Sequence, residues 1–250
     1  MARESAIRVL EDPPLDGPTN MARDEALLDA VGAGKSPPTL RLYGWEPATI
    51  SLGYFQRYGD FQSQAGPLGD LPVVRRLTGG GAILHDLELT YAIVLPTAHT
   101  LLSHGPNCLY EDVHAAVISS LAALQVPASR AGNTHSSTPK RTPFFCFARR
   151  HRFDVVIGRG KIAGSAQRRT RSAVLQHGSI ILADRYGQPG LADLNVAVAD
   201  TIRRLRQLLP SEVGRVAGLD LMLGEWGRAE LAGADALVLK YAGPDWTRRM

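Results

Sequence analysis

The chain has 250 residues, of which 44% are hydrophobic and 21% are charged, a balance typical of a soluble globular protein with a buried core. No run approaches the roughly 18 apolar residues of a membrane-spanning helix, and the first residues lack the apolar centre of a signal peptide. These patterns predict a cytoplasmic protein that does not enter a membrane. The net charge of +4 favours an acidic protein partner over nucleic acid, because no zinc knuckle, recognition-helix motif or aromatic-interleaved basic run is visible.

The hydrophobic pattern predicts runs of strands with helices inserted between them. In chain order we expect a strand at 6–10, a helix at 20–32, strands at 40–43 and 49–52, a short helix after 53–56, strands at 73–76 and 89–95, a helix at 108–126, a polar loop at 128–142, strands at 153–157 and 173–183, and helices at 194–209 and 226–231 before a frayed C-terminus. Such runs indicate an α+β fold whose mixed, largely antiparallel sheet is packed by helices. Because no linker or repeat is visible, we expect residues 1–250 to form a single domain.

Single residues mark two boundaries near the N-terminus. Pro13, Pro14 and Pro18 should end the first strand, which we expect at an edge of the sheet. Thr19 or Asn20 can cap the first helix, since both side chains accept hydrogen bonds from free backbone N–H groups.

A triple glycine preceded by arginines stands out in RRLTGGGAILHDLELTYAIVL, residues 75–95. Because Gly79, Gly80 and Gly81 lack a Cβ, the backbone can take positive φ and a ligand can lie directly against main-chain N–H groups. Arg76 and the arginine before it supply positive charge for an acidic ligand group. The stretch predicts a site for a small molecule with a phosphate, carboxylate or activated acyl group, and the alternative is an ordinary glycine hairpin with surface arginines. The strands at 73–76 and 89–95 should flank this loop as neighbours.

A second candidate site is the turn GRGKIAGSAQ at residues 158–167. In a hairpin of small residues, Lys161 can place its ammonium beside a ligand to neutralise a phosphate, polarise an acyl carbonyl or activate a thiol. The turn does not have the spacing of a Walker phosphate loop. The alternative is a solvated hairpin lysine.

Cys146 is a third candidate. It lies between phenylalanines at the end of the polar loop, an arrangement that suits the mouth of an apolar pocket. A nucleophilic thiolate needs a cationic neighbour, for which Lys161 is the obvious candidate. The alternative is a buried core cysteine, which is also what we expect of Cys108. Two cysteines are too few for a disulfide scaffold.

Two of the seven histidines, His85 and His177, lie in patterned contexts within or beside strands. The others, His114 among them, are expected in loops or on polar helix faces. No histidine or cysteine spacing supports zinc, so no metal site is predicted. Ser165 lacks the second glycine of a nucleophile elbow and is better explained as a small residue that allows close backbone approach.

Taken together, these stretches resemble the biotin/lipoate protein ligase catalytic-domain family. RRLTGGGAILHD is similar to the lipoate-ligase signature of arginine, Ser/Thr, three small residues and His-Asp. GRGKIAGSAQRR followed by LQHGSIIL is similar to the family's lysine hairpin and the next strand, and TNMARDEALL and LRLYGWEPATISLGYFQ are similar to its first helix and strands. The resemblance covers residues 18–184. It implies a class II aminoacyl-tRNA synthetase/biotin ligase-like catalytic domain, followed by a helical part at 190–250.

Within this family the chain is most similar to the cysteine-dependent octanoyltransferases, in which a Cys-Phe pair precedes the lysine hairpin, as Cys146 and Phe147 do here. Gly81 is a departure, because these transferases tend to have TGGRA and TGGGA is the ligase-like form. The resemblance implies that octanoyl passes from acyl carrier protein to Cys146, and then to a lysine of a lipoyl domain or glycine-cleavage H protein. No metal or nucleotide cofactor is required.

The resemblance also implies roles for individual residues. Cys146 attacks the thioester, and Lys161 favours the thiolate or orients the acyl carbonyl. Substrate contacts are expected from Arg76, Thr78, Gly79, Gly80, Gly81, His85, Gly164, Ser165 and His177. Two alternatives stay open: an ATP-dependent lipoate–protein ligase that uses ATP and Mg²⁺ to form lipoyl-adenylate, and a non-catalytic paralogue that binds an acyl carrier. A biotin ligase is less favoured, because no GRGRxGR-like motif is found.

Overall fold

The computed structural model describes residues 6–64, 66–132, 143–192 and 194–249. Within this part of the chain the main sheet has eight strands, ordered β11–β1–β2–β6–β10–β9–β8–β7. In that order they are Asp220–Leu223, Ala6–Leu15, Thr39–Trp45, Glu88–Pro96, Ala173–Ile181, Gly160–Arg169, Val155–Ile157 and Ser129–Arg130. Strand β1 is parallel to both neighbours, and every other neighbouring pair is antiparallel. The predicted α+β fold with a mixed, largely antiparallel sheet is confirmed.

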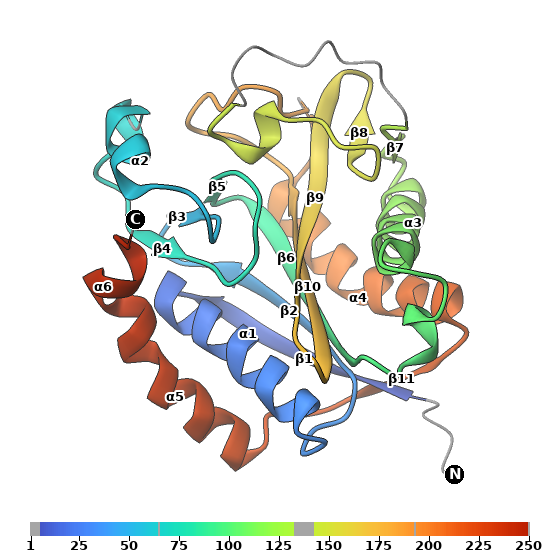
Figure 1. The fold of residues 1–250 in the computed structure, drawn as a ribbon. Coiled ribbons are helices and arrows are strands. Elements are labelled where there is room, and N and C mark those ends of the chain that lie inside the picture. Colours follow the sequence, from blue (N-terminus) through green and yellow to red (C-terminus); the bar gives the residue numbers. More distant parts are fainter. Residues whose placement is uncertain (1–5, 65, 133–142, 193, 250) are drawn as a thin grey trace.

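Helices cover both faces of the main sheet (Figure 1). One face carries α1 (Gly17–Gly32) and α5 (Arg228–Ala242), and the other carries α3 (Cys108–Ala123) and α4 (Val198–Ala217). In β6, Tyr91 and Ile93 enter the core beneath α3 and α4, whereas Ala92 and Val94 enter the core beneath α1 and α5. Because successive side chains of a strand point to opposite faces, a strand covered on both sides reads as a continuous apolar run.

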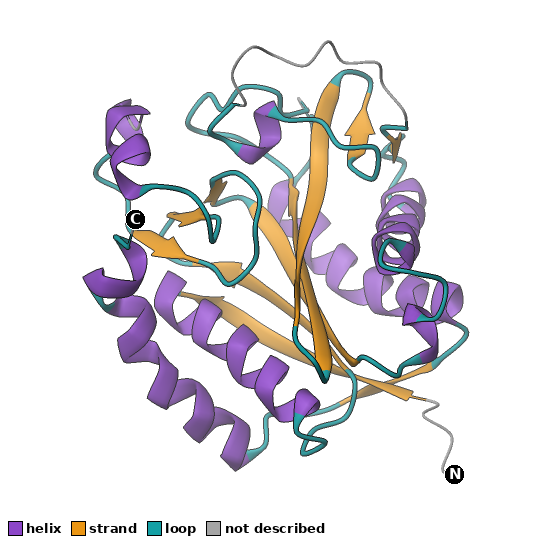
Figure 2. Cartoon of the chain, viewed as in Figure 1, coloured by secondary structure: helices purple, strands orange, loops and turns teal. Residues whose placement is uncertain are grey.

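A second, three-stranded sheet lies beside the main one and carries the glycine loop (Figure 2). Its central strand β3 (Thr49–Leu52) pairs with β4 (Val73–Arg75) and β5 (Ile83–His85). The expectation that 73–76 and 89–95 are neighbouring strands is therefore wrong. The chain inserts β5 after the glycine loop, so the loop joins two strands that both pair with β3, and β6 then enters the main sheet.

The remaining helical segments are short. They are α2 (Tyr58–Gln64), α6 (Pro244–Thr247) and single 3₁₀ turns at Gly66–Leu68, Thr100–Leu102 and Cys146–Ala148. The helix predicted at 108–126 is confirmed as α3. Most of the predicted polar loop, residues 133–142, lies outside the described residues.

The first strand does not end at the prolines, and it is not an edge strand. β1 continues through Pro13 and Pro14, and its pairing with β2 shifts register between Glu11 and Pro14. An irregular ladder tolerates proline because the missing N–H is not needed there. The outer place is taken by β11, which pairs with residues 6–9. The first helix is capped by Asp16, whose side chain accepts from the backbone N–H of residue 19 at 2.8 Å.

The C-terminal segment is packed against the second sheet rather than frayed. Helix α5 extends well past the predicted 226–231. The buried guanidinium of Arg75 donates to the carbonyls of Thr247 at 2.9 Å and Arg249 at 3.1 Å. In return the indole N–H of Trp246 donates to the Arg75 carbonyl at 2.8 Å. A short sequence window cannot show this, because the partners are far apart in the chain.

A fully buried arginine ties β1, β2 and α1 together. Arg41 donates to Asp12 at 2.6 Å, to Asp24 at 2.7 Å and to the side-chain oxygen of Asn20 at 2.7 Å. Burial alone would raise the pKa of both carboxyls, but their hydrogen bonds and the Arg41 charge hold each pKa below the ordinary 3.8. The folded state is therefore stabilised by the ionised carboxylates above that pH, and this stabilisation is lost as pH falls.

We expect Arg41→Met to lower the free energy of unfolding at pH 7 by about 3–5 kcal/mol, because it removes the cation that two buried carboxylates share and leaves only Asp12 with another, Arg23 at 2.6 Å. The difference from the wild type should shrink as pH falls below 3.8 and through the lowered pKa values of the two carboxyls, where both become neutral. Urea unfolding at several pH values measures both effects. Arg203→Met, which removes an exposed pair with Asp200, is the control and should change stability by less than about 0.5 kcal/mol. An equal loss in both variants, or a pH-independent loss, would contradict this account.

Candidate active site

Cys146 begins a single 3₁₀ turn that is held against the glycine loop. The N–H of Ala82 donates to the Phe144 carbonyl at 3.0 Å, and the N–H of Cys146 donates back to the Ala82 carbonyl at 2.8 Å. A Cβ on Gly81 would lie 2.7 Å from the Phe144 oxygen and 2.8 Å from the Cys146 nitrogen. Glycine at 81 thus allows the backbone around the cysteine to approach this closely. The residue after the cysteine, Phe147, is buried and anchors the turn.

Lys161 reaches the same place from strand β9. Its ammonium lies 3.7 Å from the Cys146 sulfur and 3.0 Å from Asp154 Oδ1, and the residue is only 3% exposed. The β8–β9 register shifts between Val155 and its neighbour, a bulge of the kind that re-aims a side chain. A Cβ on Gly164 would lie 2.7 Å from the ammonium nitrogen, so this glycine leaves the space into which the lysine folds. The interaction of Lys161 with Cys146 therefore depends on Gly81 and Gly164.

The guanidinium of Arg76 shapes the glycine loop. It donates to the carbonyls of Gly79 at 2.8 Å and Gly81 at 2.7 Å, to both oxygens of Ser51, and to the Thr78 hydroxyl. Its N–H groups are thus used within the protein. Burial lowers the Arg76 pKa to about 10, the effect of desolvating a cation that has no carboxylate within hydrogen-bond distance among the described residues. The group remains charged at neutral pH.

The three glycines contribute in different ways. Of the three, only Gly80 has a positive φ, 95°, whereas Gly81 is needed for close approach, as described above. Among the described residues, the N–H groups of Gly79, Gly80 and Gly81 have no protein acceptor. They form a set of backbone donors next to the cysteine, as the sequence suggested.

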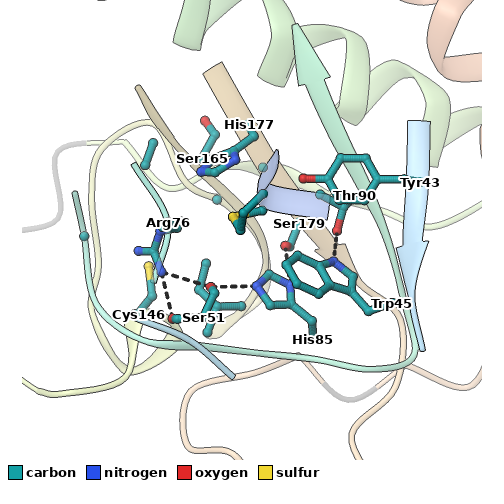
Figure 3. Close-up of a pocket in the computed structure, with 16 residues that line it drawn as sticks. Tyr43, Trp45, Ser51, Arg76, His85, Thr90, Cys146, Ser165, His177 and Ser179 are labelled. Carbon is teal, nitrogen blue, oxygen red and sulfur yellow. Dashed lines mark hydrogen bonds between the residues drawn. The ribbon is translucent and has the colours of Figure 1, made fainter. Parts of the chain in front are cut away.

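An inner pocket extends from Cys146 between the two sheets (Figure 3). Its cavity volume is about 40 Å³, and its exposed wall is mostly apolar. The lining residues include Met21, Tyr43, Trp45, Ser51, Arg76, Gly80, Ile83, His85, Thr90, Gly164, Ser165, His177 and Ser179. At its far side the ring of His85 stacks on Trp45 at 3.9 Å and bonds Ser51 at 2.7 Å.

His177 links this pocket to the buried cluster around Arg41. Its Nδ1 lies 3.0 Å from Asp24, and its Nε2 lies 2.6 Å from the Thr78 hydroxyl. Burial lowers the pKa of His177, although Asp24 opposes the shift. A neutral imidazole then donates to Asp24 through Nδ1 and accepts from Thr78 through Nε2. The Thr78 oxygen is held in place between His177 and Arg76.

A broader, more polar groove opens on the other side of Cys146. It is lined by Gly79, Gly80, Gly81, Asn107, Tyr110, His114, Cys146, Arg149, Arg150, His151, Phe153, Asp154, Lys161, Ser165, Ala166 and Gln167. Cys146, Gly80, Ser165 and Ala166 line both spaces, so the cysteine stands where the inner pocket meets the groove. The only carboxylate in the described lining, Asp154, is paired with Lys161, so the arginines leave the groove with excess positive charge.

Every site residue predicted from the sequence except Thr78 lines one of these two spaces, and Thr78 lies directly behind His177. The prediction for His114 is wrong. It is 1% exposed, and its Nε2 lies 2.8 Å from the Ser165 hydroxyl. Burial lowers its pKa to about 4, and its Nδ1 donates to the Phe153 carbonyl. No local pattern marks His114, because only the fold places it beside Ser165.

Asp154 and Ser51 were also missed. Asp154 precedes β8 and contacts Lys161, and Ser51 bonds both Arg76 and His85. Neither stands in a motif, and only the fold brings them to the site. Among the described residues, no group of three or more His, Cys, Asp or Glu is arranged to hold a metal ion. Likewise, no helix in the described ranges has the length and apolar character needed to cross a membrane.

The fold of the chain is shared with a solved structure. Protein Ta0514 of T. acidophilum, a proposed lipoate protein ligase, superposes with a TM-score of 0.75 over 98% of this chain and 99% of its own, at 21% identity, which shows a shared fold. The chain belongs to the lipoyl protein ligase A/B catalytic domain family, whose model matches residues 16–188.

Two curated relatives carry a more specific name. Octanoyltransferase LipM of Moorella thermoacetica is 42% identical over 87% of this chain and 78% of its own. Octanoyltransferase LipM of Symbiobacterium thermophilum is 37% identical over 84% of this chain and 73% of its own. The predicted resemblance to the family is therefore confirmed.

We expect Gly164→Ala to displace the Lys161 ammonium and slow alkylation of Cys146 by iodoacetamide by about tenfold, because an adjacent ammonium favours the reactive thiolate. The neighbouring atoms belong to the end of a flexible side chain, so the fold should persist. Gly79→Ala is the matched control, because its Cβ would meet nothing closer than the Phe55 ring at 3.9 Å. Mass spectrometry of the alkylated protein gives the rate, and thermal unfolding checks the fold. Equal rates in the two variants would show that Gly164 does not control the lysine.

Proposed function

We propose that this protein is an octanoyltransferase of protein lipoylation. It moves an octanoyl group from acyl carrier protein, through a thioester on Cys146, to a lysine of a lipoyl domain or glycine-cleavage H protein. The observation that carries the proposal is the Lys161 ammonium 3.7 Å from the Cys146 sulfur, where a narrow apolar pocket meets an open polar groove. The name shared by the curated relatives supports octanoyl as the transferred group.

In the first step the Cys146 thiolate attacks the carbonyl carbon of the donor thioester. A new S–C bond forms, the donor's C–S bond breaks, and the departing thiolate takes a proton from the Lys161 ammonium. The products are octanoyl-Cys146, a neutral lysine and the free thiol of the carrier. The lone N–H groups of Gly79, Gly80 and Gly81 supply donors for the oxyanion that develops on the carbonyl oxygen.

In the second step a neutral amine of the acceptor lysine attacks the acyl-cysteine. The N–C bond forms, the Cys146–acyl bond breaks, and the proton lost by the amine returns to Lys161. This restores the thiolate and ammonium. Two acyl transfers from sulfur replace one difficult transfer, which is the advantage of covalent catalysis.

The two spaces fit the two parts of an acyl carrier thioester. The inner pocket takes the octanoyl chain, whose burial against apolar walls contributes about 0.8 kcal/mol per CH₂. Arg76 and His177, with Thr78 behind them, define its polar end near the carbonyl, and His85 lies at its far side. The groove takes the polar arm of the donor and later the acceptor lysine, and its excess positive charge suits acidic partner proteins.

This reaction needs no metal or nucleotide, and we propose that it takes place in the cytoplasm. The ligase alternative differs in that the acid is first activated by ATP, so Cys146 would be incidental. Two observations favour the ligase alternative: glycine at position 81, and the fold shared with a proposed lipoate protein ligase. The sharpest difference between the two is whether acyl transfer survives without ATP and without the thiol.

We expect intact-protein mass spectrometry to show one octanoyl group added to the wild type after mixing with octanoyl-acyl carrier protein in the absence of ATP. Cys146→Ala should take up none, because no nucleophile remains. Lys161→Ala should acylate at least about a hundredfold more slowly, since general acid–base help contributes about 10²–10⁴ in rate. Cys108→Ala is the matched control and should behave as the wild type, because that thiol is buried and donates to the Leu101 and Gly105 carbonyls.

Three other outcomes would overturn the proposal. Acceptor modification that requires ATP and survives Cys146→Ala would identify a ligase. Carrier binding with neither an acyl-enzyme nor acceptor modification would identify a non-catalytic paralogue. Normal acylation of Lys161→Ala, in a protein that is folded, would remove the lysine from the mechanism.

A further inference from the structure

We propose that Asp154 is a positioning residue of the transfer reaction and completes a Cys146–Lys161–Asp154 triad. This inference rests on the proposed function. It concerns how the lysine is held between its two tasks, which are to give a proton to the departing thiol and to take one from the incoming amine.

Among the described residues, the side chain of Asp154 bonds only Lys161 and its own turn. The residue is 5% exposed, and its Oδ1 lies 3.0 Å from the lysine ammonium. Its other oxygen, Oδ2, accepts the N–H of His151 at 2.7 Å, while its own N–H donates to the His151 carbonyl at 2.9 Å. The carboxylate is thus fixed by a tight turn directly before β8 and aimed at the ammonium.

The contact between the Lys161 ammonium and the Cys146 sulfur shows why the lysine needs Asp154. Lys161 has a long flexible chain, and its hydrogen bond to the Cys146 sulfur, at 3.7 Å, is the longer of its two polar contacts. When Cys146 carries an acyl group the sulfur is no longer an anion and Lys161 has given up its proton, so the attraction between them is lost. Asp154 is then the anion within reach that keeps Lys161 beside the acyl carbonyl.

The charges around the cysteine support the same role. Arg76 and Lys161 are both buried cations, and Asp154 lies against one of them. A buried ammonium is costly unless it is paired. A carboxylate that is separate from the nucleophile can pair with the ammonium and can accept an N–H from the neutral amine, so it holds Lys161 in place in both half-reactions.

Asp154→Asn separates this role from a structural one. The amide oxygen of asparagine can still accept the His151 N–H, so the turn is kept while the charge is removed. We expect the variant to acylate Cys146 about a hundredfold more slowly at saturating donor, with KM little changed, because a misplaced catalytic group of this kind costs about 10² in rate. In the Lys161→Ala background the same substitution should cause no further slowing, because Asp154 acts through the lysine.

The measurement is the rate of acyl-Cys146 formation by mass spectrometry for the wild type, both single variants and the double variant. Two donors are compared, octanoyl-acyl carrier protein and p-nitrophenyl acetate, which acylates a reactive thiol without any carrier. Asp200→Asn, which breaks an exposed pair with Arg203, is the matched control and should match the wild type. Thermal unfolding confirms that each variant is folded.

Slowing by Asp154→Asn that disappears in the Lys161→Ala background would support the triad. The same slowing in both backgrounds would overturn it and assign Asp154 to the fold alone, and so would wild-type rates for Asp154→Asn with both donors. The two donors separate this inference from the proposed function. If lysine-dependent slowing appears with p-nitrophenyl acetate while the carrier thioester gives no acyl-enzyme, the triad stands and the octanoyltransferase proposal falls.

Discussion

The site is organised by the guanidinium of Arg76, which has no carboxylate within hydrogen-bond distance in the described part of the chain. Its N–H groups donate to neutral oxygens, chiefly the carbonyls of Gly79 and Gly81 and both oxygens of Ser51. Removing a cation from water costs free energy, and here the backbone dipoles take the place of water around the guanidinium. The glycine loop is the shape that the chain takes to supply those dipoles. Because residues 82 and 146 pair through their backbones, the loop in turn sets where the nucleophile lies.

The lysine side of the site follows from a different constraint, which is space. In GRGKIAG the turn requires a left-handed residue, met by Gly158 with a φ of 55°. Three residues after Lys161, Gly164 leaves room for the side chain to fold back over its own strand. A bulge at this point breaks the regular alternation of the ladder. Strand, turn and bulge together bring a flexible cation to a defined and largely buried position.

Much of this could be predicted from the sequence, because the residues concerned act locally. The chemical properties of three consecutive glycines, a lysine among small residues and a cysteine among phenylalanines do not depend on the rest of the fold. The structure brings these residues together in one site. The helix at 108–126 was also determined locally, by its apolar spacing. Family resemblance then connected stretches that no local argument could join, and the family match at 16–188 agrees closely with the expected 18–184.

What could not be predicted depends on pairing between distant residues. Strand β1 lost its edge position because residues 220–223 return beside it, and no pattern near Ala6 signals that return. The three residues of β5 are too few to show a period, so the second sheet was missed. Asp154 and His114 have ordinary local surroundings, and they matter because of the lysine and serine that the fold places beside them.

The docking of residues 246–249 onto Arg75 has a consequence for synthesis on the ribosome. Arg75 is the immediate neighbour of Arg76, and its guanidinium joins the carbonyls of Gly53 and Gln56 to those of Thr247 and Arg249. A chain that emerges from its N-terminus can pair β3 with β4 early, yet this arginine lacks some of its acceptors until residue 249 has left the exit tunnel. The wall of the site that carries the glycine loop therefore becomes fully hydrogen-bonded only after residue 249 has been made. A nascent chain that stalls before that point would contain Cys146 and Lys161 but would lack part of the hydrogen bonding that fixes the wall of the site.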